Sequence, residues 1–219
     1  MNKNTWIIAL VIVWIGASLG GLTWMKLNKI HPFVPMDAPY QMRDIEQVTS
    51  QLENFLNNDA ELIKTGSLDN RVTLMHFYNP DCFCNAVSKR HLDEVLKTFN
   101  AETLRWVIVV PFDTDSSSIT TIQQRNPRAV VVRDSVNLPI SSSPSLAVFS
   151  NKHELAYFGA YGFGALCTLS EENIFVSMVS RLQQSAAGES DYGPFLNIAG
   201  SGCFCAWPKT VSPEINTKE

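Results

Sequence analysis

The sequence has few charged residues and no block of basic ones. Only 17% of its 219 residues are charged, 45% are hydrophobic, and the formal net charge is −4. A disordered chain has the opposite balance of charged to apolar residues, so this composition excludes disorder and predicts a folded domain. Because no run of roughly five or six basic residues occurs, we expect no nucleic-acid partner.

Motifs for nucleotide binding and for serine hydrolases are missing as well. The chain has no GxGxxG or GxxxxGK[ST] phosphate loop and no GxSxG nucleophile elbow. We therefore predict no organic cofactor and no hydrolase activity. What the sequence does contain is two identical Cys-Phe-Cys tripeptides, which hold four of its five cysteines. The function is expected to depend on these cysteines.

A run of 19 uncharged residues, Trp6–Trp24, lies near the N-terminus. As a helix it spans about 28 Å, close to the thickness of a bilayer's hydrocarbon core. Tryptophan at both ends, with Lys26 and Lys29 directly after, suits the two membrane interfaces. We therefore predict a single transmembrane anchor over residues 1–25. A cleaved signal peptide is the alternative, but Ile15 fits its small-residue cleavage motif poorly.

Composition divides the rest of the chain into three parts. Residues 26–42 contain three prolines and are expected to form an extended linker. Residues 43–187 are expected to form one globular domain. Residues 188–219 are rich in glycine, serine, proline and asparagine, and they carry the second Cys-Phe-Cys motif. We expect them to form a flexible C-terminal tail.

Hydrophobic periodicity within the domain predicts alternating strands and helices. Apolar runs suit buried strands, and segments with apolar residues three or four positions apart suit helices with one buried face. The alternation favours a parallel sheet flanked by helices and completed by a hairpin. The expected strands are 72–78, 104–111, 129–134, 145–149 and 154–162, and the expected helices are 43–57, 85–99, 116–125 and a last one from Ile174.

The order of motifs in this domain resembles the thioredoxin superfamily. An apolar strand leads through Phe77 to Cys82 at the start of a helix, and Ser143-Pro144 precedes a strand pair that ends at Gly159. The resemblance implies an α/β, thioredoxin-like fold with a central mixed sheet flanked by helices, preceded by the single transmembrane helix. The whole layout also resembles an uncharacterised family of bacterial membrane-anchored thioredoxin-like proteins with paired Cys-Phe-Cys motifs.

The resemblance also implies roles for particular residues. Cys82 is expected to be the catalytic nucleophile and Cys84 its partner. Pro144 is expected to be a cis-proline that presents the backbone of Ser143 to an extended substrate. His76 stands where the family places a buried carboxylate that accepts a proton, and a histidine suits that task. The other interpretation of His76 is an ordinary residue of the core.

The cysteine spacing departs from the family, which has two residues between its cysteines rather than one. In a regular helix the side chains of Cys82 and Cys84 diverge, so a bond between them needs a non-helical turn. Cys203 and Cys205 are expected to act as resolving or structural partners if the tail folds back. Cys167 is either a further partner or a buried, inert thiol. The sequence leaves the disulfide connectivity open.

Three functions fit these observations. The first is a membrane-anchored thiol-disulfide oxidoreductase acting on protein disulfides, with a membrane or periplasmic electron partner. The second is binding of copper or zinc by Cys82, Cys84, Cys203 and Cys205. The third is a non-catalytic interaction module whose tail is fixed by disulfides. A bridge that closes a loop of about 120 residues contributes on the order of 4 kcal/mol.

Cysteine usage decides the expected compartment, because the charges on either side of the apolar run are nearly balanced. Paired cysteines behind an anchor favour an oxidising environment. We therefore expect a single-pass protein of the bacterial inner membrane with its globular domain in the periplasm.

Overall fold

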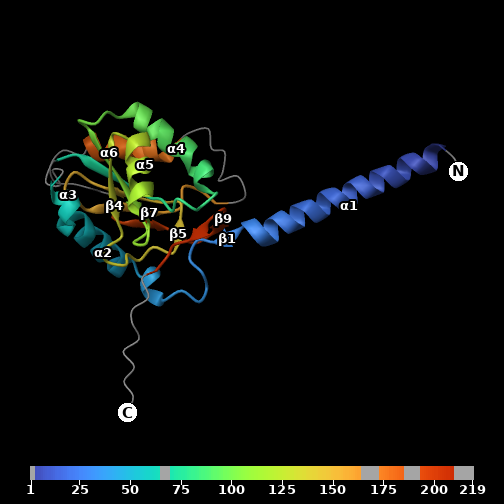
Figure 1. The fold of residues 1–219 in the computed structure, drawn as a ribbon, viewed down its shortest axis with the longest axis horizontal. Coiled ribbons are helices and arrows are strands. Elements are labelled where there is room, and N and C mark those ends of the chain that lie inside the picture. The colour runs from blue at the N-terminus through green and yellow to red at the C-terminus, as the bar shows by residue number, and fades with distance from the viewer. Residues whose placement is uncertain (1–2, 65–69, 164–172, 185–192, 210–219) are drawn as a thin grey trace, which may run out of the picture.

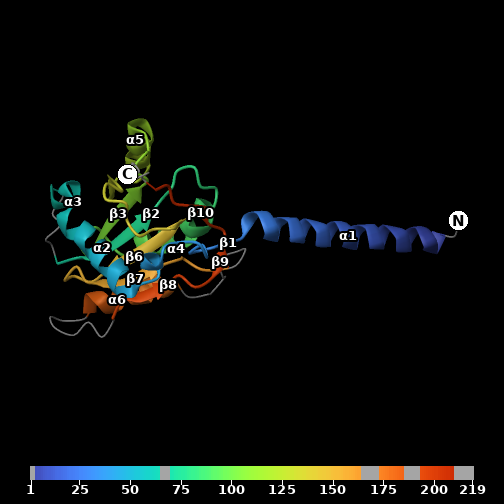
Figure 2. The ribbon, with the colours of Figure 1, turned by 90° about the horizontal axis from the view of Figure 1, so that it is seen from below.

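The computed structural model describes residues 3–64, 70–163, 173–184 and 193–209. A long N-terminal helix, α1 (Lys3–Lys29), projects away from a layered α/β domain (Figures 1 and 2). Its segment Trp6–Trp24 is long and apolar enough to cross a membrane, although a signal sequence near an N-terminus has the same properties.

A mixed sheet forms the centre of the domain. Among the described residues, six strands are hydrogen-bonded in the order β4-β3-β2-β6-β7-β8. Strands β2, β3 and β4 are parallel, β6 is antiparallel to β2 and to β7, and β8 is parallel to β7. The strands are β2 (Val72–Phe77), β3 (Leu104–Val110), β4 (Ala129–Arg133), β6 (Ser145–Phe149), β7 (Leu155–Gly159) and β8 (Phe195–Asn197).

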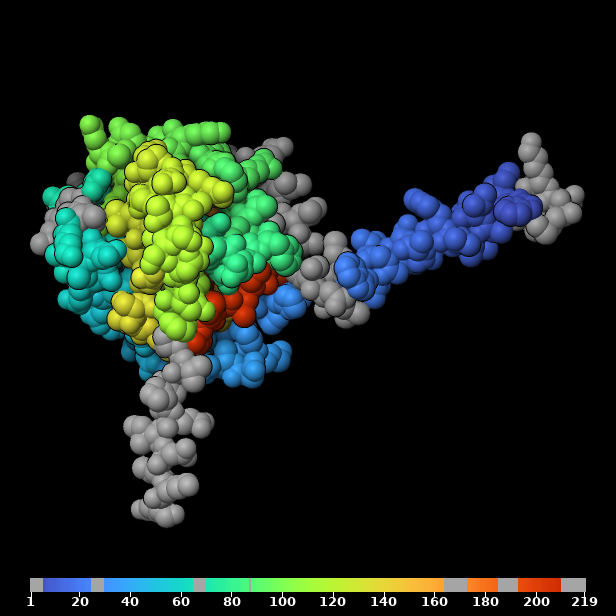
Figure 3. Space-filling view, in the orientation of Figure 1, coloured from blue at the N-terminus to red at the C-terminus, as the bar shows by residue number. Residues whose placement is uncertain are grey.

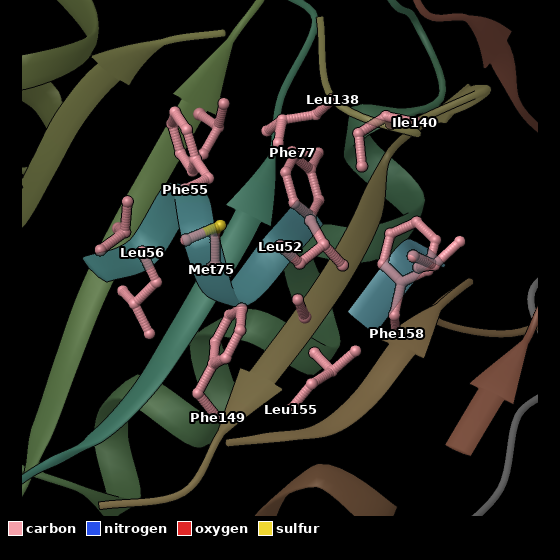
Figure 4. Close-up of a cluster of buried hydrophobic side chains, with 14 of the residues drawn as sticks. Leu52, Phe55, Leu56, Met75, Phe77, Leu138, Ile140, Phe149, Leu155 and Phe158 are labelled. Carbon is pink, nitrogen blue, oxygen red and sulfur yellow. The ribbon is translucent and has the colours of Figure 1, made fainter. Parts of the chain in front are cut away.

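Helices cover both faces of the sheet because side chains alternate between the faces along each strand. In β2, Met75 and Phe77 point to a core that α2 and α3 close, and Leu74 points to a second core beneath α4, α5 and α6. Figure 4 shows the first core, in which Leu52 and Phe55 of α2 lie against the strands of the sheet. The helices are α2 (Ile45–Asn58), α3 (Ala60–Lys64), α4 (Asn85–Thr98), α5 (Ser116–Arg125) and α6 (Ile174–Gln184).

This architecture confirms the predicted fold class: a central mixed sheet flanked by helices, with an apolar N-terminal helix. The predicted strands and helices within the domain match the observed ones to within a few residues. Asp44 caps α2 by accepting hydrogen bonds from the amides of Glu46 and Gln47, which explains why this helix begins where the apolar periodicity begins.

The C-terminal segment differs from the flexible tail expected over residues 188–219. Strand β8 extends the central sheet, and the short strands β9 (Ser201–Gly202) and β10 (Cys205–Ala206) pair with other parts of the domain. Apolar side chains explain the difference, because Phe204 and Trp207 are both buried in the first core. The described part of the tail is therefore an integral part of the domain.

The linker expected over residues 26–42 is also partly built into the domain. Strand β1 (His31–Pro32) pairs with β9, and a short 3-10 helix, η1, spans Tyr40–Met42. Between these elements Phe33 is fully buried, and its ring meets that of Phe204 edge to face with the centroids 5.1 Å apart. The linker and the tail thus hold each other against the core.

Candidate functional site

The first Cys-Phe-Cys motif lies in the turn that joins β2 to α4. The backbone amide of Cys82 donates to the carbonyl of Asn79 at 3.0 Å, and Cys84 is the N-cap residue of α4. Cys82 therefore precedes the helix by three residues and is not part of its first turn. This turn supplies the non-helical geometry that a pair of cysteines at this spacing needs to face the same way.

The two motifs are joined to each other by two disulfides. Cys82 is bonded to Cys205 and Cys84 to Cys203, with Cα–Cα distances of 5.7 and 5.5 Å. The motifs thus lie antiparallel, with their cysteines facing across the contact. The phenylalanine of the first motif, Phe83, is 59% exposed, and that of the second is buried.

The four sulfur atoms form one compact cluster. Cys82, Cys84 and Cys203 are buried, and Cys205 is half-buried against them. The Sγ atoms of Cys82, Cys84 and Cys205 all lie within 4.8 Å of one another. Such proximity allows a thiolate released from one bond to attack the other without a large movement of the chain.

A proline loop supports this cluster from the side of the sheet. The Ser143–Pro144 peptide bond is cis, and the carbonyl oxygen of Ser143 lies 3.4 Å from the Sγ of Cys82. The Ser143 hydroxyl accepts from the amide of Asn79 at 3.0 Å and donates to the carbonyl of Phe77 at 3.3 Å. The predicted residues Cys82, Cys84 and Pro144 therefore lie together in space.

The second motif runs along this loop as a short strand. In the antiparallel pair of β10 with β5 (Ser142–Ser143), Cys205 lies opposite Ser143, and Ala206 opposite Ser142. One residue further, the amide of Trp207 donates to the carbonyl of Ser141 at 3.0 Å. Figure 3 shows this C-terminal segment, in red, as a narrow strip beside the blue linker.

Trp207 joins the C-terminal segment to a buried carboxylate. Its indole nitrogen donates to Asp134 Oδ2 at 3.0 Å, and its ring stands perpendicular to that of Phe77, with the centroids 6.1 Å apart. Asp134 is 2% exposed and also accepts from the amide of Leu138. Lys209 donates to the Leu138 carbonyl, and burial lowers the pKa of its ammonium to about 8 although Asp134 opposes the change.

His76 is buried on the opposite face of the sheet from this strip. The Tyr161 hydroxyl lies 2.8 Å from its Nδ1. Burial lowers the pKa of His76 to about 4, opposed by a hydrogen bond with the Ser145 backbone, so the ring is neutral at neutral pH. Burial also raises the pKa of Tyr161, so its hydroxyl stays protonated and is available as the hydrogen-bond donor to Nδ1 of the neutral ring.

The surroundings of His76 fit a core residue better than a proton acceptor beside Cys82. Among the described residues, no hydrogen bond joins it to a cysteine; its ring neighbours are Tyr78 and Tyr161. It lines a cavity of about 340 Å³ together with Asn85, which directly follows Cys84. The catalytic role of His76 stays a prediction.

Sequence reasoning missed two groups of this site, Asp134 and Trp207. A carboxylate at the end of β4 and an aromatic residue after the second motif are both visible in the sequence, but only the fold brings them together. Cys167 lies outside the described residues, so its predicted role is untested. As disulfides the four paired sulfurs offer no thiolate, so the predicted copper or zinc site would need both bonds to be reduced first.

The fold and the site together define a thioredoxin-like protein. Its features are the strand order β3-β2-β6-β7, a cysteine in the turn before α4, and a cis-proline before β6 that contacts this cysteine. A family model described as a domain of unknown function (DUF6436) matches residues 51–207, and the chain belongs to this family. A search of curated proteins found no match.

Several solved structures are similar to the chain at low identity. A hypothetical protein from Sinorhizobium meliloti matches with 11% identity and a TM-score of 0.49, covering 66% of this chain and 83% of its own. A secreted disulfide oxidoreductase from Mycobacterium tuberculosis matches with 16% identity, a TM-score of 0.37, and coverage of 52% and 84%. A thiol:disulfide interchange protein from Chlorobium tepidum matches with 11% identity, a TM-score of 0.37, and coverage of 52% and 83%.

Proposed function

We propose that this protein is a membrane-anchored thiol-disulfide oxidoreductase that acts on protein disulfides through Cys82. The observation that carries the proposal is the position of this cysteine. Its Sγ is bonded to a cysteine of the C-terminal segment and lies 3.4 Å from the carbonyl of Ser143, at the edge where a chain can pair with β5. An exchangeable sulfur beside a strand edge that pairs with an extended segment suits reaction with an extended polypeptide.

The reaction begins from the reduced protein. The thiolate of Cys82 attacks one sulfur of a substrate disulfide; a Cys82–substrate disulfide forms, and the other substrate sulfur leaves as a thiolate. Cys205 is bonded to Cys82 in the oxidised structure, so its thiolate is the group placed to attack Cys82 next. This second step forms the Cys82–Cys205 bond and releases the substrate as a dithiol. A dithiol electron partner then returns both electrons to the protein.

The position of α1 supports a partner at the membrane. Strand β1 begins two residues after α1 ends and pairs with β9, and Cys203 directly follows β9. The disulfides therefore lie close to the end of the apolar helix, and the ribbon shows β1 and β9 beside that end (Figure 2). We infer an inner-membrane anchor, a periplasmic domain, and an electron partner that is within or beside the bilayer.

Trapping of the mixed disulfide tests this function. The full-length protein in detergent is reduced and mixed with a disulfide-bonded test protein, and the products are separated without reductant after thiol alkylation. Cys82→Ser is expected to abolish exchange, and Cys205→Ser is expected to accumulate the adduct on Cys82. Cys167→Ser is the matched control. Undiminished exchange by Cys82→Ser would refute the proposal.

A second function, a stapled module without catalysis, is favoured by one observation. Both disulfides attach a segment whose Phe204 and Trp207 belong to the first core, so the bonds also secure packing. Bonds with this role are expected to resist the glutathione pool, with potentials below about −300 mV. Resistance of this kind would favour the module over the oxidoreductase.

A further inference from the structure

The C-terminal segment occupies the strand edge on which the proposed function depends. Residues 205 and 206 pair with β5, and the amide of Trp207 bonds to the carbonyl of Ser141. The Asn79 side chain donates to the carbonyl of Ala206 at 3.5 Å. These contacts are made to the backbone of the segment, so another extended chain with its own cysteine would find the same partners.

Two side-chain contacts favour particular residue types at two positions of the segment that pairs with β5. The Trp207 indole is 3% exposed, rests against Phe77, and donates to the buried carboxylate of Asp134. The ammonium group of Lys209 reaches the carbonyl of Leu138 at 2.6 Å. In contrast, the side chain of Ala206 is exposed. The positions two and four residues after the cysteine are thus recognised, and the position between the cysteine and the indole is not.

We infer that residues 205–209 occupy the substrate site of this enzyme, so that Cys82–Cys205 is an internal form of the enzyme–substrate disulfide. This inference rests on the proposed function. It names the substrate class: an extended polypeptide segment with a cysteine, a large aromatic N–H donor two residues later, and a basic residue two residues after that. The segment's own sequence, Cys-Ala-Trp-Pro-Lys, has this pattern.

Occupation of the site also regulates it. A dithiol reductant attacks Cys205 Sγ; its sulfur bonds to Cys205, and Cys82 leaves as a thiolate. The second thiol of the reductant then displaces Cys205 as a thiolate, and the reductant becomes a disulfide. Reduction of Cys84–Cys203 in the same manner removes the second disulfide, so that no cross-link then holds the segment in the site. A substrate then competes with the segment only for the backbone hydrogen bonds to β5 and for the space beside Phe77 and Asp134 that the Trp207 indole fills.

A thiol-disulfide exchange reaction that releases a coloured thiolate tests this inference. The protein is the full-length chain in detergent with Cys167→Ser, Cys203→Ser and Cys205→Ser, which keeps the segment but removes its bonds to Cys82 and Cys84. The probe is a peptide of residues 200–209 with serine for Cys203, in which the remaining cysteine is disulfide-bonded to 5-thio-2-nitrobenzoate. Attack by Cys82 forms the protein–peptide disulfide and releases the coloured thiolate. Cys82→Ser in the same background gives the blank rate.

Two comparisons decide the outcome. The peptide with tryptophan is expected to react at least tenfold faster than the same peptide with alanine in its place. Adding Trp207→Ala to the protein is expected to raise the rate with the tryptophan peptide at least tenfold, because the segment then no longer fills the position of the indole and competes less strongly for the site. If Trp207→Ala does not fold, Lys209→Ala replaces it, and the two peptides are still compared on the parent protein.

Failure of the inference and failure of the proposed function give different results. Equal rates with the two peptides, in a protein whose Cys82 still reacts with 5,5′-dithiobis(2-nitrobenzoate), would overturn the inference and leave the oxidoreductase standing. No reaction of Cys82 with either reagent would overturn both. A rate difference that persists in Cys82→Ser would show that the peptide reacts elsewhere and would also overturn the inference.

Discussion

At Trp207 a single indole N–H links the C-terminal segment to the buried carboxylate of Asp134. Hydrogen bonds to charged acceptors contribute more than those between neutral groups, and a buried carboxylate that loses one of its donors keeps the cost of its burial. The same contact is thus expected to stabilise the fold and to define the substrate pocket.

Replacement of this indole is expected to lower stability measurably. Trp207→Phe keeps an aromatic ring against Phe77 but removes the bond to Asp134, so the free energy of unfolding should fall by about 1.5–3 kcal/mol more than in a matched control. Trp106→Phe is that control, because its indole is also buried but has no hydrogen-bond partner among the described residues. Urea unfolding of both variants measures the difference, and equal losses would contradict this account.

Buried His76 makes stability depend on pH. Its folded-state pKa of about 4 lies below the ordinary value of 6.5, so the unfolded chain takes up a proton that the folded chain does not. The contribution of the neutral His76 to the free energy of unfolding is complete above pH 6.5 and is lost as the pH falls toward 4. Between pH 7.5 and 5, unfolding free energies should fall by about 2 kcal/mol more in the wild type than in His76→Gln. The exposed His31→Gln is the control and should retain the wild-type slope.

Among the elements, β8 depends on a close approach at Gly159. This residue has φ of +151°, and a Cβ there would lie 2.2 Å from the carbonyl oxygen of Asn197. The amide of Ala160 also donates to that carbonyl at 3.1 Å. Only glycine allows β7 and β8 to meet in this way.

A methyl group at this position is expected to separate the two strands. Gly159→Ala should reduce the free energy of unfolding by about 2 kcal/mol or more, through both the clash and the backbone conformation. Gly193→Ala is the control, because a Cβ there meets nothing within 4 Å. Hydrogen exchange at β8 amides should accelerate in the first variant only; protection equal to that of the wild type would show that the strands adjust at no cost.

The elements also show how far sequence reasoning reached. Strands such as 104–110 were predictable because their apolar runs are continuous, and α2 because its apolar stripe follows a capping Asp44. The strands β8, β9 and β10 were not predictable, because strands of two or three residues are too short to show a hydrophobic periodicity. Connectivity of the cysteines likewise follows from the path of the tail and not from their spacing.

At the scale of the whole molecule, the disulfides close two nested loops with sequence separations of 123 and 119 residues. Once either bond is present, the other closes a ring of only the two motifs. In the chain-entropy description the long loop contributes about 5 kcal/mol and the small ring about 2 kcal/mol. The first bond to be removed is therefore expected to cost little stability and the last one most, whichever of the two bonds is removed first.

Paired serine variants test this order. Removal of one bond by Cys82→Ser with Cys205→Ser, or by Cys84→Ser with Cys203→Ser, should cost about 2 kcal/mol. The variant that lacks both bonds should lose about 5 kcal/mol more. Guanidinium unfolding of the three variants gives these differences, and additive losses of equal size would contradict the nested-loop description.

The central claim, that a bond of Cys82 opens and closes during function, has one direct test. The full-length protein is equilibrated with glutathione buffers from reducing to oxidising, its thiols are trapped, and intact mass and peptide mapping identify each bond. The account predicts the pairs Cys82–Cys205 and Cys84–Cys203, with the first opening near or above about −230 mV. Resistance of both bonds to below about −300 mV would contradict it and leave only structural staples.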